Sequence, residues 1–369
     1  MFIESLTERI GEDWALALGG LLIGAAFGFF AQRSRFCLRS AVIEFARRHH
    51  GGKLTVWLFA FSSAVVATQL LAWLGAFDAS DARQISARGS LSGAAIGGAL
   101  FGMGMILARG CSSRLLVLAA QGNLRSVMSG LIFAVTAQSA WTGALSPLRE
   151  TISGWWTVEG GAARDLVAST GIGHGGAVLF GLVWLVAAIY WARHQRVPAW
   201  GWAGAIGVGL VIAAAWWFTF AVAQVSFDPH PIQALSFTGP SAEVLTRVLF
   251  VSDKPPNFDM GLMPGVVLGS FIAAALYREL KLEGFAGGAS MRRYIVGAIA
   301  MGFGGMTAGG CAVGAGLSGA AVFTATAWVT LFAMWGAAAL TDRLVDQLPA
   351  GALDQPIAGT VPQAAGHAA

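Results

Sequence analysis

Long apolar runs separated by polar connections, such as 78–90, 146–173 and 226–260, are the dominant pattern along this chain. Nine runs stand out: 14–31, 54–77, 91–108, 124–146, 173–192, 200–225, 261–278, 294–309 and 321–341. A membrane-spanning helix needs about 20 mainly apolar residues. The pattern therefore predicts an all-α polytopic membrane protein with about nine transmembrane helices in a lipid bilayer.

The composition supports a membrane class over a soluble one. Only 11% of the residues are charged and 56% are hydrophobic, whereas soluble domains carry about 25% charged residues. Segment 1–13 has neither a basic start nor a small-residue cleavage site, so we expect no removable signal peptide. The net charge of +4 comes without a basic patch interleaved with aromatics, so no nucleic-acid partner is expected.

The distribution of basic residues predicts an orientation. Lys and Arg follow the first, fifth and seventh runs, at Arg47, Arg48, Lys53, Arg193, Arg196, Arg278, Lys281, Arg292 and Arg293. Because cytoplasmic loops carry the excess of such residues, we expect a bacterial inner-membrane protein. Segment 1–13 would be periplasmic and the C-terminus cytoplasmic. The tail, 346–369, is poor in large apolar residues and is predicted to be disordered.

An internal repeat links the third and eighth runs at an offset of 200 residues. The matching pairs are Gly97/Gly297, Gly102/Gly302, Gly104/Gly304, Ala108/Ala308, Gly110/Gly310 and Cys111/Cys311. An offset of 74 residues aligns the first run with the third, through the pairs Phe27/Phe101, Gly28/Gly102, Arg35/Arg109 and Cys37/Cys111. Every cysteine of the chain thus ends one copy of the same unit.

A short stretch follows each cysteine before the next polar or glycine break: 38–48, 112–120 and 312–319. None of these stretches is long enough to cross a bilayer. We therefore expect short re-entrant or half-membrane helices, buried in protein or facing a watery cavity. The predicted directions of the third and eighth runs give pseudo-symmetric inverted repeats. The expected parts are a first half (14–146) with the Cys37 and Cys111 units, a connecting loop and linker helix (147–199), and a second half (200–345) with the Cys311 unit.

The placement of the cysteines suggests an anion path. Backbone N–H groups and the helix dipole at the start of a short helix favour anions, and thiols are soft, polarizable neighbours. Ser112 and Ser113 are candidate residues of this path and are also plausible helix caps there. A small divalent anion with a terminal sulfur, such as thiosulfate, fits this chemistry. With an odd count of three, the cysteines cannot all pair in disulfides.

The residues around the cysteines have two interpretations each. Gly110 and Gly310 could be packing devices or site elements. Arg109 and Arg114 could be interfacial anchors or could attract an anion. Gln121 and Ser318 could donate hydrogen bonds at half-helix ends or serve as helix-end caps.

Enzymatic and cofactor motifs are missing from the sequence. It has no Walker A loop, no HExxH helix and no carboxylates at the centres of the apolar runs. We therefore expect neither an enzyme nor a cofactor or metal centre.

Three stretches resemble the YeeE/YedE family of sulfur-transport membrane proteins: RSRFCLRSA (33–41), GMGMILARGCSSRLLVLAAQGNLRS (102–126) and GAIAMGFGGMTAGGCAVGAGLSGAAVFTATAWV (297–329). The resemblance implies an all-helical transporter that takes up thiosulfate. It also implies that Cys37, Cys111 and Cys311 contact the substrate in turn. A small cytoplasmic sulfurtransferase of the TusA type often accompanies family members.

One departure from the family pattern bears on the substrate. The second motif has Arg109 and Arg114 in its outer places, where many members have small residues, and this could suit a different or larger sulfur oxyanion. Three alternatives stay open: a soft-metal carrier, a membrane sulfurtransferase using a cysteine persulfide, and a scaffold with incidental cysteines.

Overall fold

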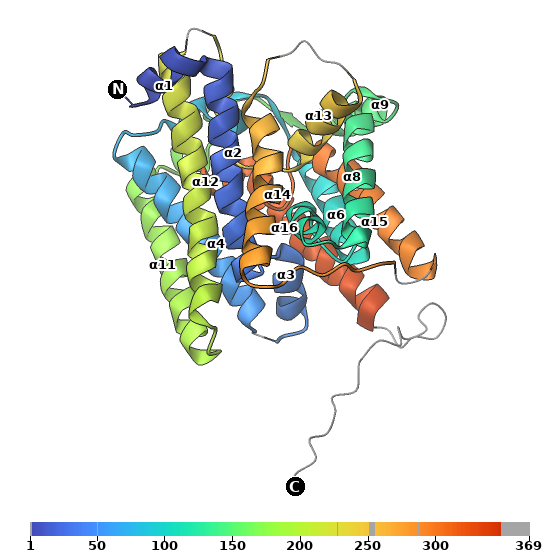
Figure 1. The fold of residues 1–369 in the computed structure, drawn as a ribbon. Coiled ribbons are helices and arrows are strands. Elements are labelled where there is room, and N and C mark those ends of the chain that lie inside the picture. The colour runs from blue at the N-terminus through green and yellow to red at the C-terminus, as the bar shows by residue number, and fades with distance from the viewer. Residues whose placement is uncertain (1, 50, 227, 251–254, 286–287, 348–369) are drawn as a thin grey trace.

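The computed structural model describes residues 2–49, 51–226, 228–250, 255–285 and 288–347, which form a helical bundle (Figure 1). Each predicted apolar run coincides with a long helix. These are α2 (Glu12–Ser34), α4 (Gly52–Trp73), α6 (Leu91–Leu107), α8 (Leu124–Thr142), α11 (Gly173–His194), α12 (Ala199–Val225), α14 (Phe258–Leu276), α15 (Gly288–Thr307) and α16 (Ala325–Thr341). Most of the predicted tail, from residue 348 onward, lies outside the described residues.

Within the described residues, six segments are long and apolar enough to cross a membrane. Two of them, Glu12–Ala46 and Leu91–Ala120, each include a predicted run and the short helix after it. The all-α membrane class is therefore confirmed. Nine crossings stays a prediction.

Four helix boundaries differ from the sequence prediction by four or more residues. α8 ends at Thr142 rather than 146, and α15 begins at Gly288 rather than 294. α4 ends at Trp73, before the predicted residue 77, because the backbone turns at Gly75 with φ +72°. α16 begins at Ala325 rather than 321, because residues up to Phe323 still belong to the preceding short segment. Phe323 itself adopts a left-handed φ of 55°.

Shorter elements fill the connections. They are α1 (Phe2–Ile10), α3 (Leu38–Ala46), α5 (Arg83–Ser86), α7 (Ser112–Ala120), α9 (Ser146–Gly154), α10 (Leu166–Thr170), α13 (Thr238–Leu249), a 3-10 turn (Ala79–Asp81), two π-helical turns (Gly314–Gly319 and Asp342–Gln347) and the antiparallel pair β1 (Gly89–Ser90) and β2 (Thr157–Val158). α13 falls in a stretch interpreted from the sequence as a polar connection, so the prediction missed it.

Glycines allow the central helices to approach closely. A Cβ atom on Gly104 of α6 would lie 2.5 Å from the carbonyl oxygen of Gly297 on α15. The same holds between α14 and α2, where a Cβ on Gly261 or Gly269 would collide with the backbone of α2. Small residues at helix interfaces are typical of membrane bundles, since they let backbones pack without intervening side chains.

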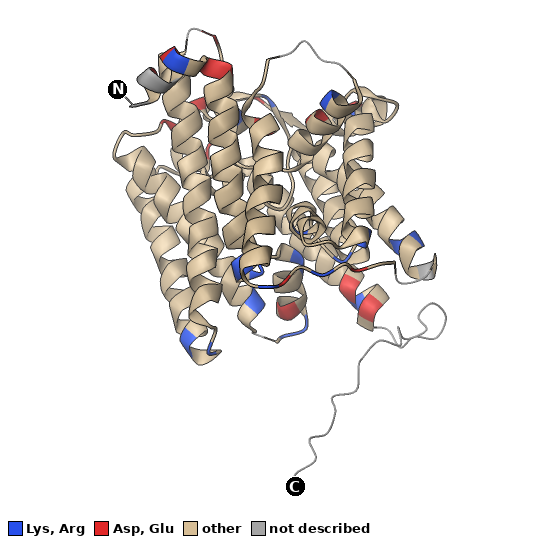
Figure 2. Cartoon of the chain, viewed as in Figure 1, with Lys and Arg blue, Asp and Glu red and all other residues tan. Residues whose placement is uncertain are grey.

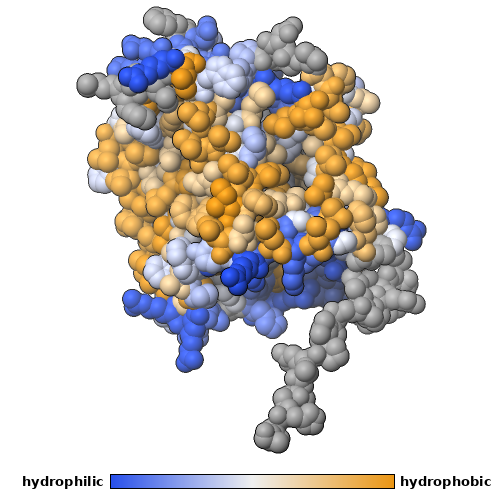
Figure 3. Space-filling model, viewed as in Figure 1, coloured by the Kyte–Doolittle hydropathy of each residue, from blue (hydrophilic) through white to orange (hydrophobic). Residues whose placement is uncertain are grey.

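The outer surface matches this class. On the face drawn in Figure 3, apolar residues form a broad band across the middle, and hydrophilic residues lie at the two ends. Lys and Arg gather at the end that carries α3 and the α14–α15 connection (Figure 2). The bundle therefore has the surface of a multi-pass membrane protein.

Candidate functional site

All three cysteines follow the same backbone turn. The residue two positions before each cysteine is left-handed: Arg35 has φ 52°, Arg109 has φ 57° and Gly309 has φ 76°. The residue directly before each cysteine donates its N–H to a carbonyl five positions earlier. These bonds are Phe36 to Ala31 (3.1 Å), Gly110 to Met105 (3.1 Å) and Gly310 to Gly305 (3.0 Å).

This turn ends the long helix and starts the short one. The cysteine carbonyls accept the first hydrogen bonds of the next segment, from Ala41 (3.3 Å), Leu115 (2.9 Å) and Ala315 (2.8 Å). Cys37 and Cys111 are the N-cap residues of α3 and α7. Left-handed backbone costs about 1–2 kcal/mol for a residue with a side chain, so the turn must be held by its surroundings at Arg35 and Arg109.

Cys37 and Cys111 form an inner pair. Their buried side chains interact with each other, and both interact electrostatically with Arg114. The Cys111 Sγ lies 3.4 Å from the Ser113 Oγ. Arg39 is a further cation beside Cys37. The inner pair therefore consists of two soft sulfur atoms beside guanidinium charge.

Cys311 is held by different elements. Its buried Sγ accepts hydrogen bonds from the backbone N–H of Phe237 (3.3 Å) and from that of Gly314 (3.4 Å). Phe237 directly precedes α13, and its ring lies 5.2 Å from that of Phe27, centroid to centroid. Two N–H groups thus converge on the sulfur, an arrangement suited to negative charge at this position.

A cavity of about 690 Å³ reaches the Cys311 turn from the end of the bundle opposite the basic one. Gly309 and Gly310 line it, together with the start of α13 at Thr238 and Gly239. The Thr238 Oγ1 is buried and has no hydrogen-bond partner among the described residues. A free hydroxyl and an uncapped helix N-terminus suit an anion beside Cys311. We call this cavity the outer vestibule.

A polar network at the basic end joins α7, α2 and the connection after α14. Gln121, at the end of α7, donates its side-chain N–H to Gln32, which in turn donates to Glu279 (2.7 Å). Glu279 also lies 3.7 Å from both Arg33 and Arg35. The connection after α14 runs along the end of α7, where the Lys281 N–H donates to the Gln121 carbonyl (3.1 Å).

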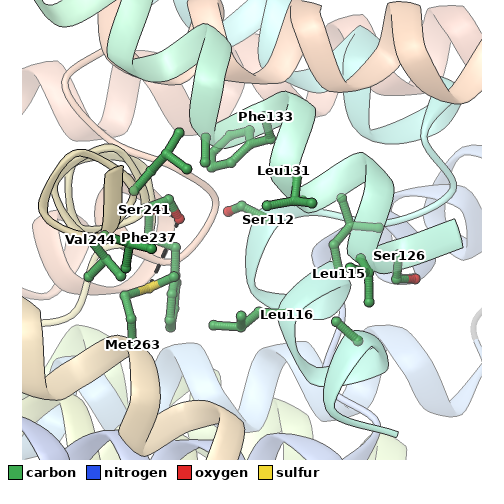
Figure 4. Close-up of a pocket in the computed structure, with 16 residues that line it drawn as sticks. Ser112, Leu115, Leu116, Ser126, Leu131, Phe133, Phe237, Ser241, Val244 and Met263 are labelled. Atoms are coloured by element: carbon green, nitrogen blue, oxygen red, sulfur yellow. Dashed lines mark hydrogen bonds between the residues drawn. The ribbon is translucent and has the colours of Figure 1, made fainter. Parts of the chain in front are cut away.

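A second, apolar cavity of about 310 Å³ opens beside α7, α8, α13 and α14. Figure 4 shows Ser112 and Ser241 on facing walls, with Leu115, Leu116 and Met263 around them. The Ser112 Oγ is buried and has no hydrogen-bond partner among the described residues. Ser112 therefore lines the apolar cavity, whereas its neighbour Ser113 contacts Cys111 of the inner pair.

The predicted capping role of Ser112 and Ser113 is wrong. The N-cap of α7 is Cys111, without a side-chain capping bond, because the turn places the cysteine rather than the serines at the cap position. Ser318 donates to the Leu235 carbonyl (2.7 Å). It thereby fixes the segment that leads to Phe237, rather than capping a helix end.

The remaining predicted residues have structural surroundings that fit either interpretation. A Cβ on Gly110 would lie 3.2 Å from Leu115, and one on Gly310 would lie 3.0 Å from the Ala315 nitrogen. Arg109 supplies the left-handed turn.

Sequence reasoning missed four residues around the cysteines: Gln32, Phe237, Thr238 and Glu279. A signal for two of them existed. The offset of 200 residues, extended toward the N-terminus, aligns Cys37 and Leu38 with Phe237 and Thr238. Cys37 and Leu38 mark the start of α3, and Phe237 and Thr238 mark the start of α13.

Comparison with known proteins decides the family. The sulphur transport family matches residues 33–340, most of the chain. This chain belongs to the sulphur transport (YeeE/YedE) family.

Two curated relatives lie in the same family range. The thiosulfate transporter TsuA of Escherichia coli (strain K12) is 26% identical over 357 residues, covering 87% of this chain and 92% of the relative. The protein of the same name from Spirochaeta thermophila is 25% identical over 328 residues, covering 84% and 93%. The alignments thus span nearly the whole length of both relatives.

Proposed function

We propose that this protein takes up thiosulfate, or a closely related small sulfur anion, along a path lined by Cys311, Cys111 and Cys37. The anion enters the outer vestibule, meets Cys311, and passes to the inner pair before release at the basic end. The thiols act without covalent chemistry, so the protein is a transporter and not an enzyme. The names of the two relatives support this substrate.

The observation that carries the proposal is the shared turn before each cysteine. It repeats the same hydrogen bonds three times in one chain, and each time a buried sulfur stands at the start of a short segment. A structural cysteine needs no such repetition. Several weak sites in series favour onward movement of an ion over tight retention.

The polar groups around the cysteines favour an anion over a soft metal ion. Cys311 Sγ receives two backbone N–H donors, and Arg114 stands beside Cys37 and Cys111. A cation would meet repulsion at both places. Within the described residues, no three His, Cys, Asp or Glu side chains gather in a metal-binding group.

Inverted pseudo-symmetric halves are part of the proposal. In this arrangement the Cys111 and Cys311 turns enter from opposite ends of the bundle. Contacts between α6 and α15 support it, because Gly97 meets Gly304 while Gly104 meets Gly297. The proposal divides the chain into a first half (14–146), a connecting part (147–199) and a second half (200–345).

The orientation follows from the charge distribution. The basic end of the bundle (Figure 2) would face the cytoplasm of the bacterial inner membrane, which leaves segment 1–13 and the outer vestibule in the periplasm. A small sulfurtransferase of the TusA type remains a predicted partner at the cytoplasmic end.

Uptake of radiolabelled thiosulfate into proteoliposomes tests the function. We expect uptake with the wild-type protein and none with empty liposomes. Mass spectrometry of the protein after incubation with thiosulfate tests the main alternative, a membrane sulfurtransferase. A persulfide would add the mass of one sulfur atom to Cys37 or Cys111, whereas our proposal expects no change in mass. A stable one-sulfur adduct that forms during turnover would favour the sulfurtransferase.

A further inference from the structure

The outer vestibule contains a buried arginine whose charge no carboxylate balances among the described residues. Arg164 is only 7% exposed and lines the cavity. It differs from the other arginines there. Arg88 pairs with Glu159 (3.9 Å), Arg247 pairs with Glu243 (2.9 Å), and Arg83 interacts electrostatically with Asp259.

The hydrogen bonds of Arg164 leave part of its guanidinium free. Nη1 donates to the Ala87 carbonyl and Nη2 donates to the Thr326 Oγ1 (2.7 Å). Nε is buried and has no partner among the described residues. Both bonded acceptors are neutral, so the positive charge stays uncompensated. Buried charges in proteins are normally paired, because desolvation of a lone ion is costly.

The surroundings of Arg164 leave room for its guanidinium. A Cβ on Gly89 would lie 2.6 Å from both the Cζ and the Nε of Arg164, so the glycine keeps this space free. Burial lowers the pKa of the Arg164 guanidinium, because desolvation disfavours its charged form. An arriving anion would stabilise that form.

Arg164 is also linked to the Cys311 turn. Its acceptor Ala87 directly follows α5, and Gln84 of α5 donates to the Gly314 carbonyl (3.1 Å). Gly314 is the residue whose N–H donates to the Cys311 Sγ. Arg164 also lines the same cavity as Gly309 and Gly310, so a ligand on Arg164 would lie in the cavity that reaches the Cys311 turn.

We propose that Arg164 is an oxyanion-docking residue of the outer vestibule, which binds the oxygen atoms of a divalent sulfur oxyanion before its sulfur reaches Cys311. This inference builds on the proposed function by naming the residue that selects the charge of the substrate. A guanidinium presents planar donors that match such oxygens. The site recognises the oxyanion part, so sulfate should bind there as well as thiosulfate.

Anion binding to purified protein in detergent tests this without any transport step. Titration calorimetry with sulfate and with thiosulfate is compared for wild type, Arg164→Gln, Arg164→Lys and Arg149→Gln. Arg149 makes a matched control because it lies in α9, pairs with Glu150 (3.1 Å) and does not line the vestibule. We expect Arg164→Gln to weaken the binding of both anions about tenfold or more, since hydrogen bonds to charged groups are the stronger ones. Arg164→Lys should be intermediate, and Arg149→Gln should match wild type.

The thermal midpoint of each variant, with and without sulfate, separates docking from a purely structural role. The proposal expects sulfate to raise the midpoint of wild type and to raise that of the Arg164→Gln variant much less. An equal sulfate-induced rise in both proteins, with equal affinities, would overturn it. Sulfate binding that depends on Arg164 in a protein without thiosulfate uptake would uphold this site and refute the proposed function instead.

Discussion

Gly104 of α6 lies against Gly297 of α15, while Gly97 of α6 lies against Gly304 of α15. These four glycines are the same residues that align at an offset of 200. Each of the two α6 glycines thus contacts the α15 counterpart of the other one. Such reciprocal contacts are typical of two units related by a two-fold axis. The pair α6–α15 therefore supports a pseudo-symmetry axis between the Cys111 and Cys311 units.

The first prediction concerns this contact. Gly104→Leu places a side chain where the α15 backbone lies, with its Cβ 2.5 Å from the Gly297 carbonyl oxygen. We expect loss of several kcal/mol of stability, or no folded protein, because overpacking a rigid backbone contact is costly. Gly130→Ala in α8 is the matched control, since a Cβ there meets nothing within 4 Å. Thermal unfolding in detergent measures both; equal midpoints for the two variants would contradict the packing argument.

The second prediction separates two adjacent serines. Ser113 contacts the Cys111 Sγ, whereas Ser112 faces the apolar side cavity. Ser113→Ala should slow thiosulfate uptake about two- to tenfold, the range that one hydrogen bond of about 0.5–1.5 kcal/mol provides. Ser112→Ala should leave the rate near wild type. Initial uptake rates at matched expression compare them, and a larger loss in Ser112→Ala would argue against the path.

The third prediction concerns Ser318, which holds the segment leading to Phe237. Its Oγ donates to the Leu235 carbonyl, and its own carbonyl accepts the Trp216 Nε1–H (3.3 Å). Ser318→Ala leaves the buried Leu235 carbonyl without that bond, and we expect about 1–3 kcal/mol lower stability. Ser318→Thr keeps the hydroxyl and should lose less. Denaturation midpoints of the two variants and wild type measure these differences. Wild-type stability of Ser318→Ala would contradict a stabilising role for the hydrogen bond to Leu235.

The fourth prediction is a pH dependence at the basic end. Burial by itself would raise the pKa of the fully buried Asp342 carboxyl, but hydrogen bonds from Arg47 and Gln347 outweigh it and lower that pKa below its usual value. The resulting stabilisation is present above the unfolded pKa of about 4. It is lost as the pH falls through the lower folded pKa.

Arg47→Met tests this sign. Arg47 donates to both Asp342 oxygens (2.9 and 2.8 Å) but is itself 38% exposed. Solvent screening reduces the value of the pair, so we expect a loss of about 1–3 kcal/mol at pH 7. The difference in thermal midpoint between variant and wild type should be full at pH 7 and should shrink as the pH falls below the unfolded pKa of about 4 and through the lower folded pKa. A constant difference across this range would contradict the assignment.

Much of the fold can be predicted from the sequence, because helices that cross a bilayer must be long and apolar. It also locates the short segments after each cysteine, since α7 matches the predicted stretch 112–120. It does not reveal α13, because that helix is short and amphipathic and lies among polar connecting residues. Contacts of the kind that Gln32 makes with Glu279 join residues far apart in the chain, so no local pattern predicts them.

The candidate site, like the fold, can be predicted from the sequence only in part. The repeat identifies Cys37, Cys111 and Cys311 from sequence, but part of their surroundings comes from elements remote in the chain. Phe237, for example, donates to the Cys311 Sγ although the two residues are 74 positions apart in the chain. The cap assignment of Ser112 failed because the left-handed turn at Arg109 shifts the helix start by one residue.

Thiosulfate-dependent growth of a strain unable to use sulfate tests the central claim most directly. Wild type is compared with Cys111→Ala and Cys311→Ala at matched expression, with Ser112→Ala as a neighbouring control. The account predicts growth with wild type and the control, and none with either cysteine variant. Undiminished growth of both cysteine variants would contradict a path lined by these thiols.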